Sequence, residues 1–250
     1  MWADNWLFAA FADPVGEVWG LVRGQREREV AVGRLGSLAA APADATTPIN
    51  GWNPAPELEL TVADDSGGPV AATADGSDAI SLLRISGTHA AGGERLEIDA
   101  PAVAVAGPKL SKLDSVRILA AWFPDDRAVA LSAVRPRSGH ADKDVVSVLV
   151  MGAGAAPADP VTAAEPGPLQ VFDPRLSTTY DGRGIPLRAG LELWLGPDED
   201  SDQRPLRLSA QSTGDRLAAE LGGLHLDAYG QRCHNRGDDG VGIYALLRPR

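Results

Sequence analysis

The sequence predicts an all-β protein made of antiparallel strands arranged in two successive units. Short extended runs recur along the whole chain, either alternating or continuously apolar, and turn residues separate them. Roughly fourteen such runs can be distinguished, and no segment keeps the 3.6-residue period of a long helix. The third observation is a central hairpin whose two faces are both only weakly polar, which indicates a place inside a larger sheet.

This central hairpin spans residues 109–137. Its runs SVRILAAWF and RAVALSAVR are joined by a turn that begins at Pro124. Asp114 and Arg117 stand at its entrance and Trp122 at its far end. These charged and aromatic residues are therefore the first candidates for contact with a ligand.

The first sixty residues predict an opening hairpin followed by single strands. NWLFAAF and EVWGLVR flank the turn ADPVG, and REVAVGRLG follows as a third strand. Residues 42–56 form a proline-rich loop around Trp52, whose ring either covers a cavity or, as we favour, plugs the core. ELELTVA then alternates, with Leu58 and Leu60 inward and the glutamates outward.

The middle of the chain predicts further strands and then a linker. AISLLRIS and RLEIDAPAVAVAG read as strands, and KDVVSVLVMG is a nearly continuous apolar run that should be buried on both faces. Residues 152–168 are small, proline-rich and without periodicity, which is typical of a linker. The sequence therefore predicts one β domain over residues 1–155 and a second over residues 168–250.

The second half repeats the pattern of strand and turn. LQVFDPRLS, PLRAGLELWLG, LRLSAQST and GVGIYALLRP predict strands. RLAAELGGLHL is ambiguous, because Leu217, Leu221 and Leu224 have the spacing of a helix as well.

Composition narrows the partners and the compartment. The net charge is -11 and no basic cluster occurs, so nucleic acid is not expected as a partner. No apolar run approaches ~18 residues, so we expect no membrane insertion. The N-terminus lacks the basic region of a signal peptide, and a cytoplasmic location is the expectation. The single cysteine, Cys233, excludes an intramolecular disulfide and a cysteine-based zinc cluster.

Short motifs do not indicate a cofactor or a metal. GAGAAP, which begins at Gly152, is close to a nucleotide-binding loop, but Pro157 and Pro160 prevent the helix that would hold a pyrophosphate. Cys233 and His234 have no third ligand nearby. His225 and Asp227 share one face of a strand, where they form either an acid–base pair or, as we favour, a solvated face.

Four segments carry a resemblance to a known family. They are NWLFAAFADPVGEVWGLVR, the D-S-V-R of Asp114 to Arg117 with AAWFPDDRAVALSAVR after it, STTYDGRGIPLRAGLELWL, and GDDGVGIYALLR. Their order resembles the two-domain lipocalin-like β-barrel family of carotenoid 1,2-hydratase (hydroxyneurosporene synthase) and related pericyclases. The family's central D-x-S-W-G-x-R motif is shortened here and lacks its Trp-Gly pair. The resemblance implies two lipocalin-like antiparallel β-barrels or sandwiches in tandem.

The resemblance also implies a cofactor-independent, non-redox enzyme of the hydratase, cyclase or isomerase type. Its substrate would be a hydrophobic small molecule such as a terpenoid, polyene or polyketide. A carboxylic acid in an apolar pocket is harder to ionise and can protonate an alkene, which makes Asp114 the candidate acid and Arg117 its charged neighbour. The alternative for this pair is an ion pair that orients a loop.

Aromatic residues on strands are the candidate ligand contacts, because their rings offer large rigid surfaces to an apolar ligand. Ordinary core packing is the alternative at each position. The candidates are Trp6, Trp19, Trp122, Trp194 and Tyr244.

Two other functional classes stay open. A non-catalytic lipocalin-like carrier would bind an apolar metabolite in a pocket lined by apolar groups alone. A structural β-sandwich that binds another protein would have no cavity. An unpaired edge strand near the N-terminus would favour a homodimer.

Overall fold

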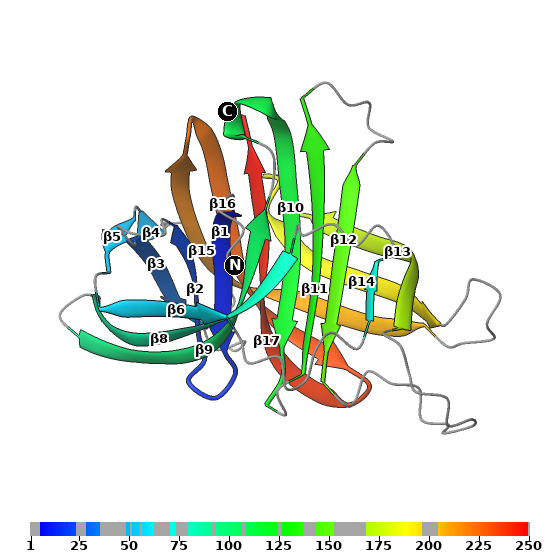
Figure 1. The fold of residues 1–250 in the computed structure, drawn as a ribbon, viewed down its shortest axis with the longest axis horizontal. Coiled ribbons are helices and arrows are strands. Elements are labelled where there is room, and N and C mark those ends of the chain that lie inside the picture. Colours follow the sequence, from blue (N-terminus) through cyan, green and yellow to red (C-terminus); the bar gives the residue numbers. More distant parts are fainter. Residues whose placement is uncertain are drawn as a thin grey trace.

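The computed structural model describes residues 6–23, 29–35, 49–50, 52–55, 57–62, 71–73, 80–91, 94–106, 109–124, 127–137, 144–152, 169–196 and 205–249. Seventeen strands in these residues form two sheets, which confirms the all-β class and the tandem arrangement predicted from the sequence (Figure 1). The strands that exceed the expected number are the shortest ones, β4 (Ile49–Asn50), β5 (Asn53–Pro54) and β7 (Ala71–Thr73).

The first sheet has seven antiparallel strands in the order β5-β3-β2-β1-β9-β8-β6. The predicted opening hairpin is confirmed as β1 and β2, and β3 is the predicted third strand. Besides β5, this sheet consists of β1 (Trp6–Asp13), β2 (Val18–Arg23), β3 (Glu29–Arg34), β6 (Leu58–Val62), β8 (Ile80–Ala91) and β9 (Glu94–Ala106).

The second sheet has ten strands in the order β14-β13-β7-β12-β11-β10-β17-β16-β15-β4, and pairing of β14 with β15 closes it into a barrel (Figure 1). Two short strands pair in parallel, β7 with β13 and β4 with β15. The remaining bounds are β10 (Leu113–Trp122), β11 (Ala128–Pro136), β12 (Val145–Met151), β13 (Leu169–Tyr180), β14 (Pro186–Gly196), β15 (Leu206–Leu221), β16 (Leu224–Asn235) and β17 (Asp238–Arg248).

The two sheets do not divide the chain at a single point. Every described strand from β10 onward belongs to the barrel sheet, and a 3-10 turn at Leu110–Lys112 precedes β10, but β4 and β7, which come before β9 in the chain, also pair within the barrel sheet. Strands on both sides of residues 152–168 belong to the barrel, and residues 153–168 lie outside the described part of the chain. The division into residues 1–155 and 168–250 stays a prediction about domains.

The central hairpin is buried on both faces, as its weak polarity predicts. Val116, Ile118 and Ala120 of β10 pack into a core shared by the two sheets, whereas Leu119 and Ala121 pack inside the barrel. A strand covered on both faces needs apolar residues at every position instead of strict alternation. β11 follows the same rule, and the hairpin is consequently the wall between the two cores.

The ambiguous segment RLAAELGGLHL forms two strands. β15 ends at Leu221, β16 begins at Leu224, and Gly222 and Gly223 between them have φ values of 57° and 83°. Glycine adopts this left-handed region without steric cost, so the pair supplies a tight turn where a helix would otherwise continue. Leu217, Leu221 and Leu224 all pack into the shared core.

The rings of Trp19 and Trp52 join the first sheet to the barrel. Trp19 of β2 is fully buried, and a Cβ atom placed on Gly230 of β16 would lie 2.7 Å from its Nε1. Trp52 packs against the same core, and its Nε1 donates a hydrogen bond to the Glu220 carbonyl oxygen at 3.1 Å. The interpretation of Trp52 as a plug is confirmed.

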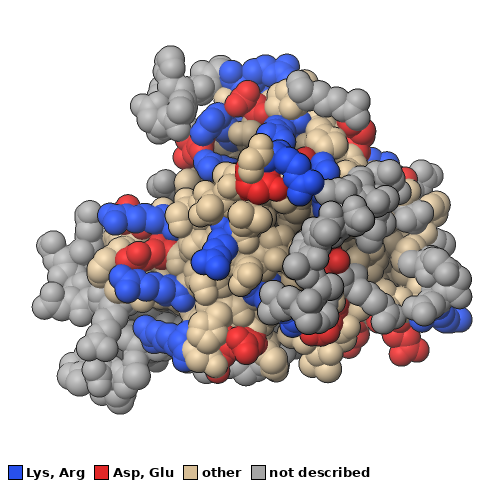
Figure 2. Space-filling view, turned by 180° about the vertical axis from the view of Figure 1, so that it is seen from behind, with Lys and Arg blue, Asp and Glu red and all other residues tan. Residues whose placement is uncertain are grey.

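The surface seen from behind carries charges of both signs. Lysines and arginines there lie interspersed with aspartates and glutamates around areas of uncharged residues (Figure 2). In the described ranges no helix has the length and apolarity needed to cross a bilayer.

Replacing Gly230 by alanine tests the contact between the sheets. The added methyl group would meet the Trp19 ring at 2.7 Å and Leu35 at 2.9 Å, so one sheet must shift. We expect Gly230→Ala to lower the free energy of unfolding by about 1–3 kcal/mol. Gly182→Ala is the control, because a Cβ there meets nothing within 4 Å. Urea unfolding followed by tryptophan fluorescence measures both, and equal stabilities would contradict the tight contact.

Candidate functional site

A groove of about 1390 Å³ lies where the outer face of the barrel meets the first sheet. Glu17, in the turn between β1 and β2, and Leu35, just after β3, form one wall. Strands β13 to β17 supply the rest of the lining. The groove is thus built from both sheets.

Two cross-strand rows of side chains form the floor of this groove. Side chains two residues apart on a strand share a face, and paired residues of neighbouring strands lie side by side. The first row is Ser177, Gly190, Ser209, His234 and Asp239, and the second is Thr179, Arg188, Gln211 and Arg232. The barrel register therefore brings polar residues from five strands into one site.

His234 and Asp239 are the acid–base pair of the first row. Nδ1 of His234 lies 3.1 Å from a carboxylate oxygen of Asp239, and the two residues are cross-strand partners. Arg236 and Gly237 of the connecting turn have φ values of 50° and 101°, as a tight hairpin turn requires. An ionised carboxylate only accepts hydrogen bonds, so Nδ1 is the donor of this pair, and in the neutral imidazole Nε2 is then the nitrogen with the lone pair.

Two arginines lie in the second row, which is next to the row that contains His234. A carboxylate oxygen of Glu17 accepts a hydrogen bond from Nη2 of Arg232 at 2.9 Å, which ties the barrel to the opposite wall. Arg188 lies two strands away, so the Cα atoms of the two arginines are roughly 10 Å apart. Gln211 lies between them in the same row. Gly190 of the first row has no side chain, and a Cβ there would lie 3.0 Å from the Ser177 hydroxyl.

The groove can move a proton and stabilise a negative charge. A histidine with a free Nε2 removes or delivers protons, and a guanidinium stabilises an oxyanion by charge-assisted hydrogen bonds. Cys233 also lies along the groove, but burial raises the pKa of its thiol, which stays protonated. In the described residues, no group of three or more His, Cys, Asp or Glu side chains is placed to hold a metal ion.

The charged candidates Asp114 and Arg117 lie elsewhere, at one end of the barrel. Nη2 of Arg117 donates to Asp144 at 3.0 Å, and Nε of Arg135 donates to the same carboxylate at 2.7 Å. The hydrogen bond to Asp144 raises the pKa of Arg135, and the charge of Asp114 adds to this effect. Within the described residues, the ion pair of Arg117 is formed with Asp144 of the neighbouring hairpin.

The five aromatic candidates are distributed over different parts of the structure. Trp19 and Trp122 are buried in the core between the sheets, and Tyr244 is buried inside the barrel. Trp6 packs on the other core of the first sheet, and Trp194 is 36% exposed on the outer face of β14. None of the seven candidate residues lines the groove, and their roles in catalysis and binding stay predictions.

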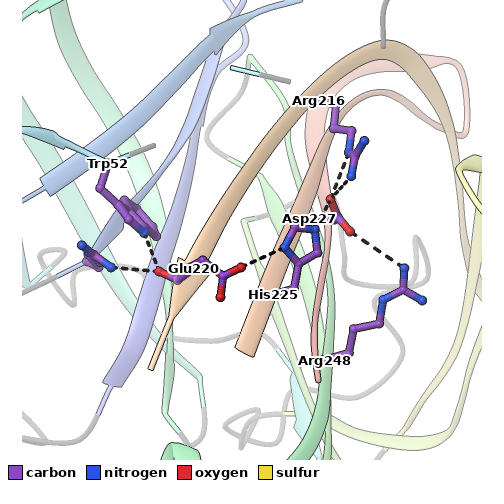
Figure 3. Close-up of polar contacts among 7 residues, drawn as sticks. Trp52, Arg216, Glu220, His225, Asp227 and Arg248 are labelled. Carbon is purple, nitrogen blue, oxygen red and sulfur yellow. Dashed lines mark hydrogen bonds and ion pairs between the residues drawn. The ribbon is translucent and has the colours of Figure 1, made fainter. Parts of the chain in front are cut away.

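His225 and Asp227 lie on the inner face of the barrel (Figure 3). Asp227 is 2% exposed and accepts hydrogen bonds from Nε of Arg216 at 2.9 Å and from its Nη2 at 2.5 Å. Nε2 of His225 is 3.2 Å from the same carboxylate. The prediction of a solvated face is wrong for this pair, because Arg216 supplies the positive charge that allows Asp227 to be buried.

Sequence reasoning did not find the residues of the groove. The sequence suggests His234 only as a metal ligand, although the turn-forming Asn235 to Asp238 indicates a hairpin that sets it opposite Asp239. Arg188 and Arg232 are separated by a whole strand, and the sequence carries no local signal for their meeting.

The fold and the groove define a protein with two β sheets in tandem and a polar site at their junction. No protein-family model and no curated protein matches the chain. Among solved structures, the crystal structure of CghA with Sch210972 is similar with a TM-score of 0.52 and 10% identity, over 98% of this chain and 88% of that one. The structure of kievitone hydratase from Nectria haematococca has a TM-score of 0.47 and 9% identity, over 98% and 89%. The similarity to CghA shows a shared fold.

Acid stability tests the ion pairs at the end of the barrel. The hydrogen bond from Arg135, followed by that from Arg117, holds the pKa of Asp144 below the ordinary value of 3.8. Its stabilising contribution is therefore complete above that value and is lost as the pH falls through the lower folded-state pKa. We expect Asp144→Asn to lower the free energy of unfolding at pH 7 by on the order of 1–3 kcal/mol and to flatten its decrease below about pH 4.

Urea unfolding at neutral and acidic pH measures this effect. Asp99→Asn is the matched control, because Asp99 pairs with Arg84 at 2.6 Å but at an exposed site, where solvent screens the pair. An equal decrease in the free energy of unfolding in both variants would contradict the larger contribution expected from Asp144.

Proposed function

We propose that the chain is a cofactor-independent, non-redox enzyme of the hydratase, cyclase or isomerase type that acts on a small molecule in the groove. The observation that supports this proposal most is the pair of His234 and Asp239, which lines the groove next to Arg232 on the same face of β16. A carrier needs only a surface that is complementary to its ligand, whereas a histidine oriented by a carboxylate is typical of an enzyme that transfers protons.

The reaction would begin with His234 as the base. Its Nε2 takes a proton from a carbon next to a carbonyl group, and the electron pair moves to the carbonyl oxygen. Arg188 or Arg232 stabilises the resulting enolate oxygen. The protonated Nε2 then returns the proton to a different carbon, so the product is an isomer of the substrate. In a hydration, the same two groups handle the protons while water adds across a polarised double bond.

The substrate class follows from the lining of the groove. Hydroxyl groups, Gln211 and the two arginines favour a ligand with carbonyl or hydroxyl oxygens. Leu35 supplies an apolar contact on the opposite wall. We therefore propose a hydrophobic small molecule with at least one oxygen function, a class that includes oxygenated terpenoids and polyketides.

Incubation with extracts of small molecules in D₂O tests the proposal. Liquid chromatography with mass spectrometry would reveal a compound that is converted without an added cofactor. We expect a product that has the same elemental composition or has gained one water, with deuterium on carbon. His234→Gln should lower kcat by about 10²–10⁴-fold, the usual contribution of a general acid or base.

The matched control is His225→Gln, which changes a histidine on the inner face of the barrel. Turnover that survives in His234→Gln, or falls equally in both variants, would overturn the assignment of the groove. A compound that binds to the groove and is recovered unchanged would instead favour the non-catalytic carrier.

A further inference from the structure

We infer a second binding site, for a small organic carboxylate, on the inner face of the barrel where Arg117, Tyr180 and Tyr244 meet. The site faces the opposite side of the barrel wall from the groove. It uses none of the residues to which the proposed reaction assigns a role.

The strand register places the three side chains together. Arg117 of β10 pairs with Leu246 of β17, and Leu119 pairs with Tyr244, so Arg117 and Tyr244 are diagonal neighbours on one face. The phenol oxygens of Tyr180 and Tyr244 lie 2.8 Å apart, which brings the end of β13 across the barrel to the same point.

This part of the barrel offers hydrogen-bond donors in excess. Arg117 has five N–H donors and, in the described residues, gives one of its nitrogens to Asp144. Burial raises the pKa of Tyr244, so its phenol is neutral. One proton of the phenol pair bridges the two oxygens, and the other phenol keeps a proton to donate outward.

Two carboxylates near the site, Asp144 and Asp227, already have partners of their own. Asp144 accepts hydrogen bonds from Arg117 and Arg135, and Asp227 is paired with Arg216 and lies 3.9 Å from Arg248 (Figure 3). An incoming carboxylate would therefore meet guanidinium and phenol donors, and these two carboxylates are already paired.

Solvent access and an apolar floor complete the site. The Arg117 side chain is 35% exposed and Tyr180 is 41% exposed, so both reach the surface. Leu119, Leu246 and Leu176 pack below them in the interior of the barrel. A donor rim above an apolar floor fits a carboxylate with a short apolar body, such as an aromatic acid.

Isothermal titration calorimetry with benzoate tests this inference on the full-length chain. We expect benzoate to bind and benzamide, its neutral counterpart of similar shape, to bind at least tenfold more weakly. Arg117→Gln should weaken benzoate binding roughly tenfold or more, and Tyr180→Phe should weaken it several-fold. Tyr180→Phe removes only one hydroxyl, from a residue that is 41% exposed, so it reports on binding even if Arg117→Gln affects folding.

Arg188→Gln in the groove separates the two sites. Benzoate binding that is lost in this variant and kept in Arg117→Gln would overturn the second site and place the anion in the groove. Equal binding of benzoate and benzamide, or no binding of either, would also overturn it. Loss of turnover in His234→Gln with intact benzoate binding would support both sites independently.

Discussion

The burial of Trp19 between the two sheets is the contact on which the rest of the structure depends. Its ring lies against Gly33 of its own sheet and Gly230 of the barrel, and both positions lack the side chain that would exclude it. Leu35 packs beside the same glycine, and its amide donates to the Glu17 carbonyl oxygen at 2.9 Å. The contact therefore positions the wall from which Glu17 reaches Arg232, and it sets the width of the groove.

β16 shows how one strand serves both packing and a site. At its beginning, Leu224, Leu226 and Ala228 point into the shared core, where the first sheet covers the barrel. The same face continues to Arg232 and His234, which line the groove beyond the edge of that core. Alternation sends Asp227 and Tyr229 to the inner face, where burial raises the pKa of Tyr229 to about 12. The two-residue period of the strand thus places the core and the groove on one face of β16, and Asp227 and Tyr229 on the other.

Local patterns were sufficient for the fold and insufficient for the site. In the apolar hairpin at residues 109–137 and in the alternating ELELTVA, the sequence pattern predicts directly which residues are buried. Successive residues of a strand point to opposite faces, so the face of each residue is fixed by its position in the strand. Trp19 and Trp194 are both aromatic residues in predicted strands, and the sequence does not distinguish them. Trp19 is fully buried and Trp194 is exposed, because only the packing of the sheets decides which face of a strand is covered. The partner of Arg117 comes from the start of β12, which no spacing near Asp114 reveals.

The interior of the barrel is occupied by its own side chains, which favours binding sites at its surfaces. Leucine, valine and tyrosine side chains from all its long strands meet inside it, as expected for a barrel just wide enough to be filled by its own residues. The two sites that we propose lie at the periphery of the barrel, one on the outer face and one at the end of the inner face. Because the fold is shared with CghA at only 10% identity, the chemistry must be argued from the side chains of this chain. Those side chains are polar, and they favour a ligand recognised by its oxygen atoms over one held by apolar contact alone.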